Sequence, residues 1–235
     1  MNDPRSSQPP GEAPSQPPGE APSKLPGKAI VIAVDGPAAS GKGTIARALA
    51  AHFSLPHMDT GLLYRAVALN LVRFGGDPGH EFEAVRACDL GSVSFDDEEL
   101  RSELVGSYAS RISAYPAVRA HLLDRQRAFA AQDGGAVLDG RDIGTVIAPD
   151  ATVKLFVTAS PEVRARRRLA ELTARGLNAH LDEILSDISA RDERDSGRAA
   201  APLLRAQDAL LLDTSEMDVA QAIAAALALV EGHLV

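Results

Sequence analysis

Cysteine, tryptophan and long apolar runs are nearly or wholly missing from this chain of 235 residues. Cys88 is the only cysteine, so an intrachain disulfide is excluded and nothing points to an oxidising compartment. No apolar run reaches the length of about 20 residues that a membrane-spanning helix needs. The first residues also lack the basic start and apolar stretch of a secretory signal. We therefore expect a cytoplasmic protein that has no membrane partner.

Positive charge is in short supply as well, because 24 lysines and arginines face 32 aspartates and glutamates. The formal net charge of −8 argues against a general nucleic-acid binder, which needs a basic surface. The apolar fraction of 45% is normal for a globular chain that buries a core. The length fits one domain of ordinary size, to which we assign residues 29–235.

The first 28 residues differ in composition from the rest. The octapeptide Ser-Gln-Pro-Pro-Gly-Glu-Ala-Pro occurs at Ser7–Pro14 and again at Ser15–Pro22, and after Met1 no large apolar side chain precedes Leu25. Such a segment cannot bury enough surface to offset the entropy lost on ordering. We predict a disordered tail at 1–28, with a polyproline ligand for a partner domain as the alternative.

From Ala29 onward, short apolar runs alternate with helical patterns. Buried strands are predicted at 29–35, 136–139, 152–157 and 210–213, and a short strand at 92–95. Helices are predicted at 42–52, 60–74, 81–88, 98–108, 116–131, 180–194 and 218–231, and another that begins at Pro161. Strands that alternate with helices imply a three-layer α/β fold with a central parallel sheet.

A glycine-rich segment joins the first predicted strand to the first predicted helix, with the sequence Gly36-Pro37-Ala38-Ala39-Ser40-Gly41-Lys42-Gly43-Thr44. Glycines let successive backbone N–H groups point at phosphate oxygens, and the helix adds its positive dipole end. We predict that residues 36–44 bind the phosphates of ATP and that Lys42 is catalytic, neutralising charge as the γ-phosphoryl group moves. The hydroxyl stands two positions after the lysine, as in adenylate-kinase-like monophosphate kinases, and we assign Thr44 to the Mg²⁺ environment.

The strings Asn-Lys-x-Asp and Asp-x-x-Gly, typical of switch GTPases, are absent from the chain. A motor or helicase normally needs a larger chain, so the segment favours a small kinase. Polar clusters should then define its acceptor. Asp59-Thr60 opens the helix that carries Arg65, although Asp59 or Thr60 could simply be the N-cap of that helix.

Asp139-Gly140-Arg141-Asp142 is a sharper candidate, because it directly follows a buried strand. Ligands collect at the carboxyl ends of strands in open α/β sheets. An arginine beside an aspartate there suits a phosphate and a ribose or base group. A loop ion pair is the structural alternative.

Two segments are rich in arginine. One contains Arg164, Arg166, Arg167 and Arg168, and the other contains Arg191, Arg194 and Arg198. The second set has the spacing i, i+3 and i+7, which places all three on one face if the helix continues through Gly197. ATP and a phosphorylated acceptor would supply the anions that such clusters need. Pairs at i and i+4, such as Arg191 with Asp195, keep a partly structural role open.

With these residues in place, the sequence closely resembles the bacterial cytidylate kinases. The resembling strings span 32–44, 58–65, 138–146 and 191–203, and they recur in the order of the family. The resemblance implies transfer of a phosphoryl group from ATP, with Mg²⁺, to CMP or dCMP. It also implies a rigid core, a monophosphate-binding insert at about 77–113 and a helical arginine lid at about 161–195. We expect a monomer whose partners are these small molecules and not nucleic acid.

The resemblance also implies site residues, position by position. Those expected at the acceptor are Thr60, Arg65, Ser110, Arg119, Arg141, Asp142, Arg191, Asp195 and Arg198. Among them Arg65 and Arg141 would contact the phosphate, Ser110 and Arg119 the base, and Asp195 the ribose hydroxyls. Catalytic roles would fall to Lys42, Arg141, Arg164, Arg167 and Arg168, the last three as lid arginines.

The chain departs from the family pattern in two places. Ala39 stands where the family often has glycine, so the loop must reach its geometry with a Cβ present. The stretch before Ser110 is shorter than the usual three-stranded insert, and only its last part, Glu98–Glu103, matches. The alternatives are a P-loop kinase for another small acceptor, such as UMP or shikimate, and a nucleotide-sensing module without catalysis.

Overall fold

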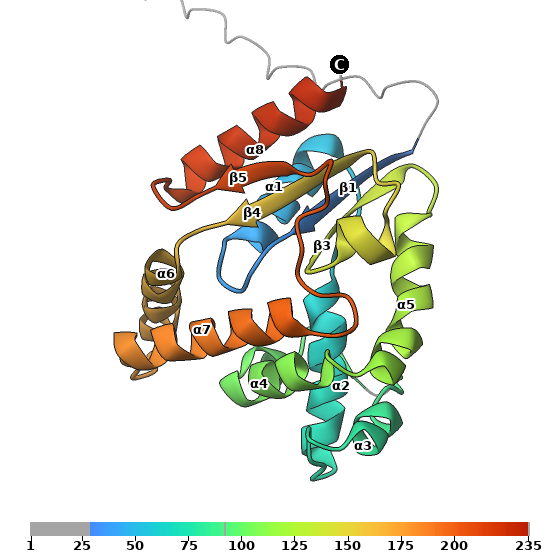
Figure 1. The fold of residues 1–235 in the computed structure, drawn as a ribbon, viewed down its shortest axis with the longest axis vertical. Coiled ribbons are helices and arrows are strands. Elements are labelled where there is room, and N and C mark those ends of the chain that lie inside the picture. Colours follow the sequence, from blue (N-terminus) through green and yellow to red (C-terminus); the bar gives the residue numbers. More distant parts are fainter. Residues whose placement is uncertain (1–28, 92, 235) are drawn as a thin grey trace, which may run out of the picture.

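The computed structural model describes residues 29–91 and 93–234, so the predicted disordered tail at 1–28 lies outside the described residues. Within this part, five strands form one parallel sheet in the order β2-β3-β1-β4-β5 (Figure 1). The strands are β1 (Ile30–Asp35), β2 (His57–Asp59), β3 (Gly135–Gly140), β4 (Val153–Thr158) and β5 (Leu210–Asp213). The prediction of a central parallel sheet is confirmed.

The central strands form because they are apolar on both faces. Ile32, Ala33 and Val34 of β1 are fully buried, as expected for a parallel strand covered on both sides. β1 pairs with β3 and β4, in a register that places Val34 beside Asp139 and Leu155. The sequence analysis missed β2, which has only three residues and no alternating pattern. This short strand places Asp59 beside Asp139 at the carboxyl edge of the sheet.

Helices cover both faces of the sheet and extend below it (Figure 1). They are α1 (Lys42–Phe53), α2 (Thr60–Arg73), α3 (Glu81–Arg86), α4 (Glu103–Ile112), α5 (Pro116–Ala130), α6 (Pro161–Ala174), α7 (Leu181–Gly197) and α8 (Val219–Leu234). Leu49 of α1 and Val230 of α8 pack on one face of the sheet, with Val157 of β4. Ala130 of α5 packs on the other face with Leu138. The three-layer arrangement is therefore also confirmed.

The insert contains helices where the sequence pattern predicted a strand. Residues 93–95 form no strand, and the helix predicted at 98–108 is divided into a 3-10 turn at Glu98–Arg101 and α4. The division falls at Ser102, which has an extended backbone and whose Oγ accepts a hydrogen bond from the N–H of Val105 at 3.3 Å. A serine N-cap starts a new helix. Buried Leu100 and Ile112 then pack against α2.

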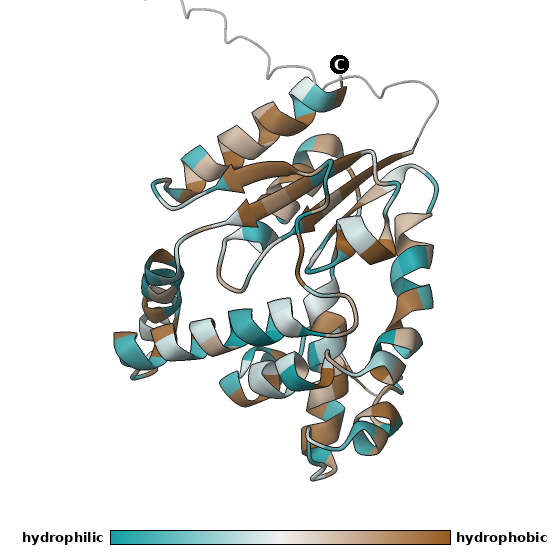
Figure 2. Ribbon diagram, in the orientation of Figure 1, coloured by the Kyte–Doolittle hydropathy of each residue, from teal (hydrophilic) through white to brown (hydrophobic). Residues whose placement is uncertain are grey.

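The segment predicted as a lid contains α6 and α7, which begin as their sequences predict. Pro161 occupies the first turn of α6, and Ser160 Oγ caps the N–H of Val163 at 3.3 Å. Ile184 and Ile188 of α7 pack against Leu172 of α6. Figure 2 shows the strands in hydrophobic colours, whereas α6 and α7 are mostly hydrophilic. Among the described residues, no helix combines the length and apolarity needed to cross a membrane.

Candidate active site

The glycine-rich segment forms a tight loop between β1 and α1. A Cβ at Gly36 would lie 2.0 Å from the carbonyl oxygen of Val157, so only glycine fits there. Gly41, with φ 88°, is the residue before α1. Ala39 adopts the left-handed conformation with φ 58°, which costs about 1–2 kcal/mol for a residue with a Cβ. Its methyl group packs against the apolar contact between α6 and α7, which joins the loop to the lid.

Lys42 lies half-buried at the start of α1, where its Nζ donates to the carbonyl oxygen of Pro37 at 3.4 Å. Burial, and then the charge of Arg141, lower the pKa of Lys42 to about 7, while Asp139 and Asp59 oppose that change. The ammonium group therefore stands among charges of both signs. An anionic phosphate at the loop would favour its charged form.

Three aspartates at the carboxyl ends of strands belong to this site, although the sequence analysis gave none of them a role in catalysis or in ATP binding. Asp35 accepts hydrogen bonds from the N–H groups of Ile143 and Gly144, both at 2.8 Å. Burial raises the pKa of Asp35 to about 7. Burial, and then the charge of Asp139, also raise the pKa of Asp59 above its ordinary value. The signal available was position, since Asp35 ends β1, Asp59 ends β2 and Asp139 is the last residue but one of β3.

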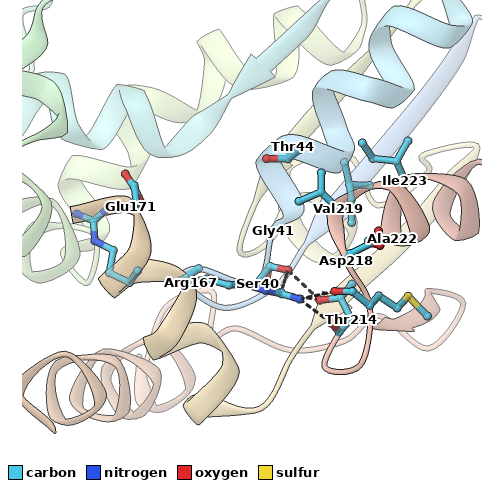
Figure 3. Close-up of a pocket in the computed structure, with 14 residues that line it drawn as sticks. Ser40, Gly41, Thr44, Arg167, Glu171, Thr214, Asp218, Val219, Ala222 and Ile223 are labelled. Atoms are coloured by element: carbon cyan, nitrogen blue, oxygen red, sulfur yellow. Dashed lines mark hydrogen bonds and ion pairs between the residues drawn. The ribbon is translucent and has the colours of Figure 1, made fainter. Parts of the chain in front are cut away.

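A cavity of about 440 Å³ opens beside the glycine-rich loop (Figure 3). One wall is apolar and comes from α8, with Val219, Ala222 and Ile223. Arg167 of α6 crosses the opposite side, where Nη1 donates to Thr214 Oγ1 at 2.9 Å and Nη2 to the Thr214 carbonyl oxygen at 2.6 Å. Thr44 also lines this cavity. An apolar wall beside a phosphate loop suits a ligand with a flat base and a charged tail.

The predicted lid arginines have different environments. Arg167 and Arg168 line the cavity, and Arg168 forms ion pairs with Glu171 at 2.6 Å and with Glu103 of the insert. Arg164 is instead buried and does not line the cavity.

Each nitrogen of the Arg164 guanidinium group has a hydrogen-bond partner inside the protein. It pairs with both carboxylate oxygens of Asp192, at 3.0 and 2.5 Å. It also donates to the carbonyl oxygens of Ala159 at 2.9 Å and of Ala38 at 3.3 Å. Arg164 thus ties α6, α7 and the loop together. Its catalytic role stays a prediction.

A second, smaller cavity, of about 60 Å³, lies between α2, α4, α5, the Asp139–Asp142 segment and α7. All the residues predicted at the acceptor line it, namely Thr60, Arg65, Ser110, Arg119, Arg141, Asp142, Arg191, Asp195 and Arg198. Ion pairs between predicted site residues close it, one from Arg141 Nε to Asp195 at 2.8 Å and one between Arg119 and Asp142. The structure therefore brings the acceptor candidates together, although they come from segments far apart in the sequence.

Several arginine nitrogens in this cavity are buried without a partner. Among the described residues, Nε of Arg191 and both Nε and Nη2 of Arg198 have no acceptor for their N–H groups. Burial, and then the charge of Arg141, lower the pKa of Arg191 to about 9, and burial lowers that of Arg198. Buried donors without acceptors are unfavourable. A bound anion would remove that penalty for both residues.

The single helix face predicted for Arg191, Arg194 and Arg198 is wrong for Arg198, whereas Arg194 follows Arg191 by three residues within α7. Helix α7 does continue through Gly197, but Arg198 lies beyond its end with an extended backbone. The extended backbone allows the Arg198 side chain to enter the cavity, where Nη1 donates to Ser113 Oγ at 3.2 Å. Arg194 is exposed and its Nε reaches Ser110 Oγ at 3.4 Å.

Thr60 is not an N-cap, and its hydroxyl has another partner. It donates to the carbonyl oxygen of Asp139 at 2.8 Å, and the preceding Asp59 makes no side-chain cap. Arg65 donates to the insert carbonyl of Leu100 at 2.6 Å. The acceptor cavity is therefore connected both to the sheet edge and to the insert.

Ser113 and Tyr64 line the same cavity and were not predicted. The Ser113 hydroxyl donates to the carbonyl oxygen of Ser110 at 2.9 Å, and its own carbonyl oxygen accepts from Arg119 at 3.3 Å. The guanidinium carbon of Arg119 lies 5.7 Å from the centre of the Tyr64 ring. Tyr64 lies within the resembling string 58–65 and directly precedes Arg65, which was a signal for it, whereas Ser113 lies outside the resembling strings.

A phosphate loop at the carboxyl edge of a parallel sheet, with an arginine-lined cavity nearby, defines a P-loop kinase. Comparisons with known proteins refine that class. The sequence profile of the cytidylate kinase family matches residues 32–232. The cytidylate kinase of Xanthobacter autotrophicus is 60% identical over 87% of this chain and 98% of its own length. That of Azorhizobium caulinodans is 57% identical over 86% of this chain and 98% of its own length.

The chain belongs to the cytidylate kinase family, and it is an ATP-dependent nucleoside monophosphate kinase. The resemblance found in its sequence is confirmed. Among solved structures, an uncharacterized protein from Eubacterium ventriosum covers 87% of this chain and 99% of its own length, with a TM-score of 0.54 and 16% identity. That similarity concerns the fold alone.

Proposed function

We propose that this enzyme transfers the γ-phosphoryl group of ATP to CMP or dCMP, giving ADP and CDP or dCDP. The observation that carries the proposal is the set of buried arginine donors without partners in the smaller cavity, close to the glycine-rich loop. Those donors suit the phosphate of an acceptor. Family membership favours a cytidine nucleotide over UMP or shikimate.

The larger cavity is the proposed ATP site. Residues 36–44 surround the phosphates, and Lys42 neutralises charge on the β- and γ-phosphates. The apolar wall formed by Val219 and Ala222 suits the adenine ring, and Arg167 lies on the opposite side of that space. Arg167 and Arg168 are the lid arginines in the best position to approach the transferring group.

The smaller cavity is the proposed acceptor site. Its volume of about 60 Å³ is well below the range of about 300–1,000 Å³ that ligand pockets occupy. CMP therefore enters only after the ion pairs Arg141–Asp195 and Arg119–Asp142 separate. Separation frees guanidinium groups for the phosphate and carboxylates for the ribose hydroxyls. The site is thus assembled by its substrate, which would limit hydrolysis of ATP in the absence of acceptor.

Phosphoryl transfer in this site needs positioning and charge neutralisation more than acid–base chemistry. The acceptor phosphate oxygen is already anionic near neutral pH, so the mechanism includes no general base. Arg65, Arg141 and Arg198 align that phosphate, while Lys42 and the lid arginines stabilise charge on the γ-group. Closure of the lid excludes water that would otherwise take the phosphoryl group.

The residues near the loop fit Mg²⁺, which favours one or two carboxylates, phosphate oxygens and retained waters. The described residues contain no group of three or more histidine, cysteine, aspartate or glutamate side chains suited to hold a metal, in keeping with a cation that arrives with ATP. Thr44 and Asp139 are the groups that would contact its shell. When bound, the ion neutralises charge on the phosphates.

The experiment that tests the proposal follows ADP production by purified protein with ATP, Mg²⁺ and a panel of acceptors. We expect turnover with CMP or dCMP well above that with UMP or shikimate. Binding of ATP without turnover for any acceptor would support a sensor instead. A preference for UMP or shikimate would show that the acceptor assignment is wrong. Because a single chain builds both cavities, we also expect the monomer to be the active form, and light scattering at assay concentration checks the oligomeric state. The expected compartment is the cytoplasm.

A further inference from the structure

His57 and Asp139 form a partly buried polar pair at the carboxyl edge of the sheet. Nε2 of His57 lies 2.7 Å from Asp139 Oδ1, and their side chains are 18% and 4% exposed. The two residues come from neighbouring strands, β2 and β3. A hydrogen bond to a carboxylate in such a dry place is stronger and better directed than one in water.

The other oxygen of Asp139 faces the glycine-rich loop. Asp139 Oδ2 lies 3.7 Å from the position that a Cβ would take at Gly43. In the commonest P-loop pattern this position, directly after the lysine, carries a hydroxyl that contacts Mg²⁺. Here it has no side chain, and the carboxylate of Asp139 comes close to the space that the hydroxyl would fill.

The surroundings of Asp139 would otherwise leave its orientation open. Asp59 ends β2 directly beside it, in register, so two carboxylates stand together at this edge. Lys42 is near enough for both to influence its pKa. The carbonyl oxygen of Asp139 is held by Thr60, but the side chain accepts its described hydrogen bond from His57.

We propose that His57 is a positioning residue that holds Asp139 Oδ1 and so presents Oδ2 to the donor phosphates and their Mg²⁺. The inference rests on the proposed function of the loop as the ATP site. It makes His57 part of the ATP site, although His57 itself does not contact the substrate. Residues that orient a group next to a metal typically contribute about 10–100-fold to metal affinity or activity.

The test compares His57→Leu with His57→Gln. Glutamine ends in an Nε2 at a similar reach to that of histidine and keeps a donor for Asp139, whereas leucine keeps apolar volume only. His52→Leu is the control, because His52 also pairs with a carboxylate, Glu231, at 2.9 Å, but this pair joins the end of α1 to α8 and lines neither cavity. The readouts are kcat, KM for CMP and for ATP, thermal stability, and Mn²⁺ binding to the ADP complex followed by electron paramagnetic resonance.

We expect His57→Leu to lower kcat and Mn²⁺ affinity by about 10-fold or more, with KM for CMP nearly unchanged. His57→Gln should recover most of both losses, and His52→Leu should behave as wild type. If His57→Leu does not fold, His57→Asn replaces it, since asparagine is too short to reach Asp139, and the same losses are expected.

Two results would overturn the inference. One is a variant with lower thermal stability but wild-type kcat and Mn²⁺ affinity, which makes the pair merely structural. The other is a change confined to KM for CMP, which places the effect at the acceptor. Mn²⁺ binding with ADP needs no acceptor. A wild-type enzyme that fails to phosphorylate CMP therefore contradicts the proposed function and still leaves His57 tested.

Discussion

Arg198 is a buried cation with more N–H donors than hydrogen-bond partners. We therefore expect it to lower the stability of the protein but to favour binding of the acceptor. Burial lowers its pKa below the ordinary value, and two of its nitrogens have no partner among the described residues. Its acidic neighbours Asp142 and Asp195 already pair with Arg119 and Arg141, so loss of the Arg198 charge leaves neither carboxylate unpaired. Replacing buried ionic groups by apolar volume is then often neutral or stabilising. We expect Arg198→Met to raise the free energy of unfolding by about 1 kcal/mol. Urea denaturation measures this change.

The same substitution should weaken binding of the acceptor. A lost hydrogen bond to a charged group amounts to about 1.5–3 kcal/mol, and so to about 10–150-fold in kcat/KM for CMP. KM for ATP should change little, because Arg198 does not line the larger cavity. The exposed Arg166→Met is a matched control without either effect. Lower stability together with normal CMP kinetics would show that Arg198 is a structural cation.

At the scale of helices, Arg164 and Asp192 hold α6 to α7 and to the loop. Removal of one partner of a buried ion pair costs about 3–5 kcal/mol, because the other charge remains without compensation. We expect Arg164→Met to destabilise the protein by about 3 kcal/mol. The double variant Arg164→Met with Asp192→Leu should recover part of this, with a coupling energy above about 1 kcal/mol. Chemical denaturation of the wild type, the two single variants and the double variant gives the coupling energy of this double-mutant cycle.

The outcome also decides the role of Arg164. If Arg164 has only a structural role, the single variant should lose stability but keep a turnover near that of wild type when it is assayed well below its melting temperature. A catalytic arginine predicts full stability with turnover reduced by orders of magnitude. The distinction matters because the sequence resemblance groups Arg164 with Arg167 and Arg168, whereas only the latter two line the larger cavity.

The elements that were predicted correctly are those whose signal is local. The apolar runs that became β1 and β4 are buried on both faces and bounded by turns, so their pattern alone was enough. Strand β2 has three residues and gains its strand geometry from pairing with β3. The strand predicted at 92–95 was wrong for residues 93–95, because tertiary contacts of the insert with α2 override weak local preferences.

The site residues also divide into those with a local sequence signal and those that depend on tertiary contacts. Arg141 and Asp142 were found because they stand directly after a strand in a recognisable motif. His57, Ser113 and Tyr64 were missed, because each contacts a residue distant in the sequence, namely Asp139, Arg198 and Arg119. The resemblance located the acceptor residues as a set, but not the extended backbone that brings Arg198 into the cavity.

For the whole molecule, buried charges of the donor site couple stability to pH in opposite directions. The pKa of Asp35 is raised from 3.8 to about 7, so the folded protein keeps a proton that the unfolded chain releases above pH 4. Stability from this group is present below pH 3.8 and is lost as pH rises to about 7. The pKa of Lys42 is lowered from 10.5 to about 7, so its contribution to stability rises as pH increases from 7 to 10.5.

Without bound nucleotide, the joint contribution of Asp35 and Lys42 to the free energy of unfolding should therefore be lowest near neutral pH. Asp35→Asn isolates one of them, because an amide is neutral at every pH and still offers an acceptor to Ile143 or Gly144. We expect the stability of this variant relative to wild type to increase between pH 4 and 7, with a slope of up to about 1.4 kcal/mol per pH unit. Urea denaturation across that range measures the slope, and Asp150→Asn, at an exposed turn, is the control. A flat difference would mean that Asp35 is ionised throughout, held by its two N–H donors, so that the sheet edge carries one more negative charge opposite the phosphates of ATP.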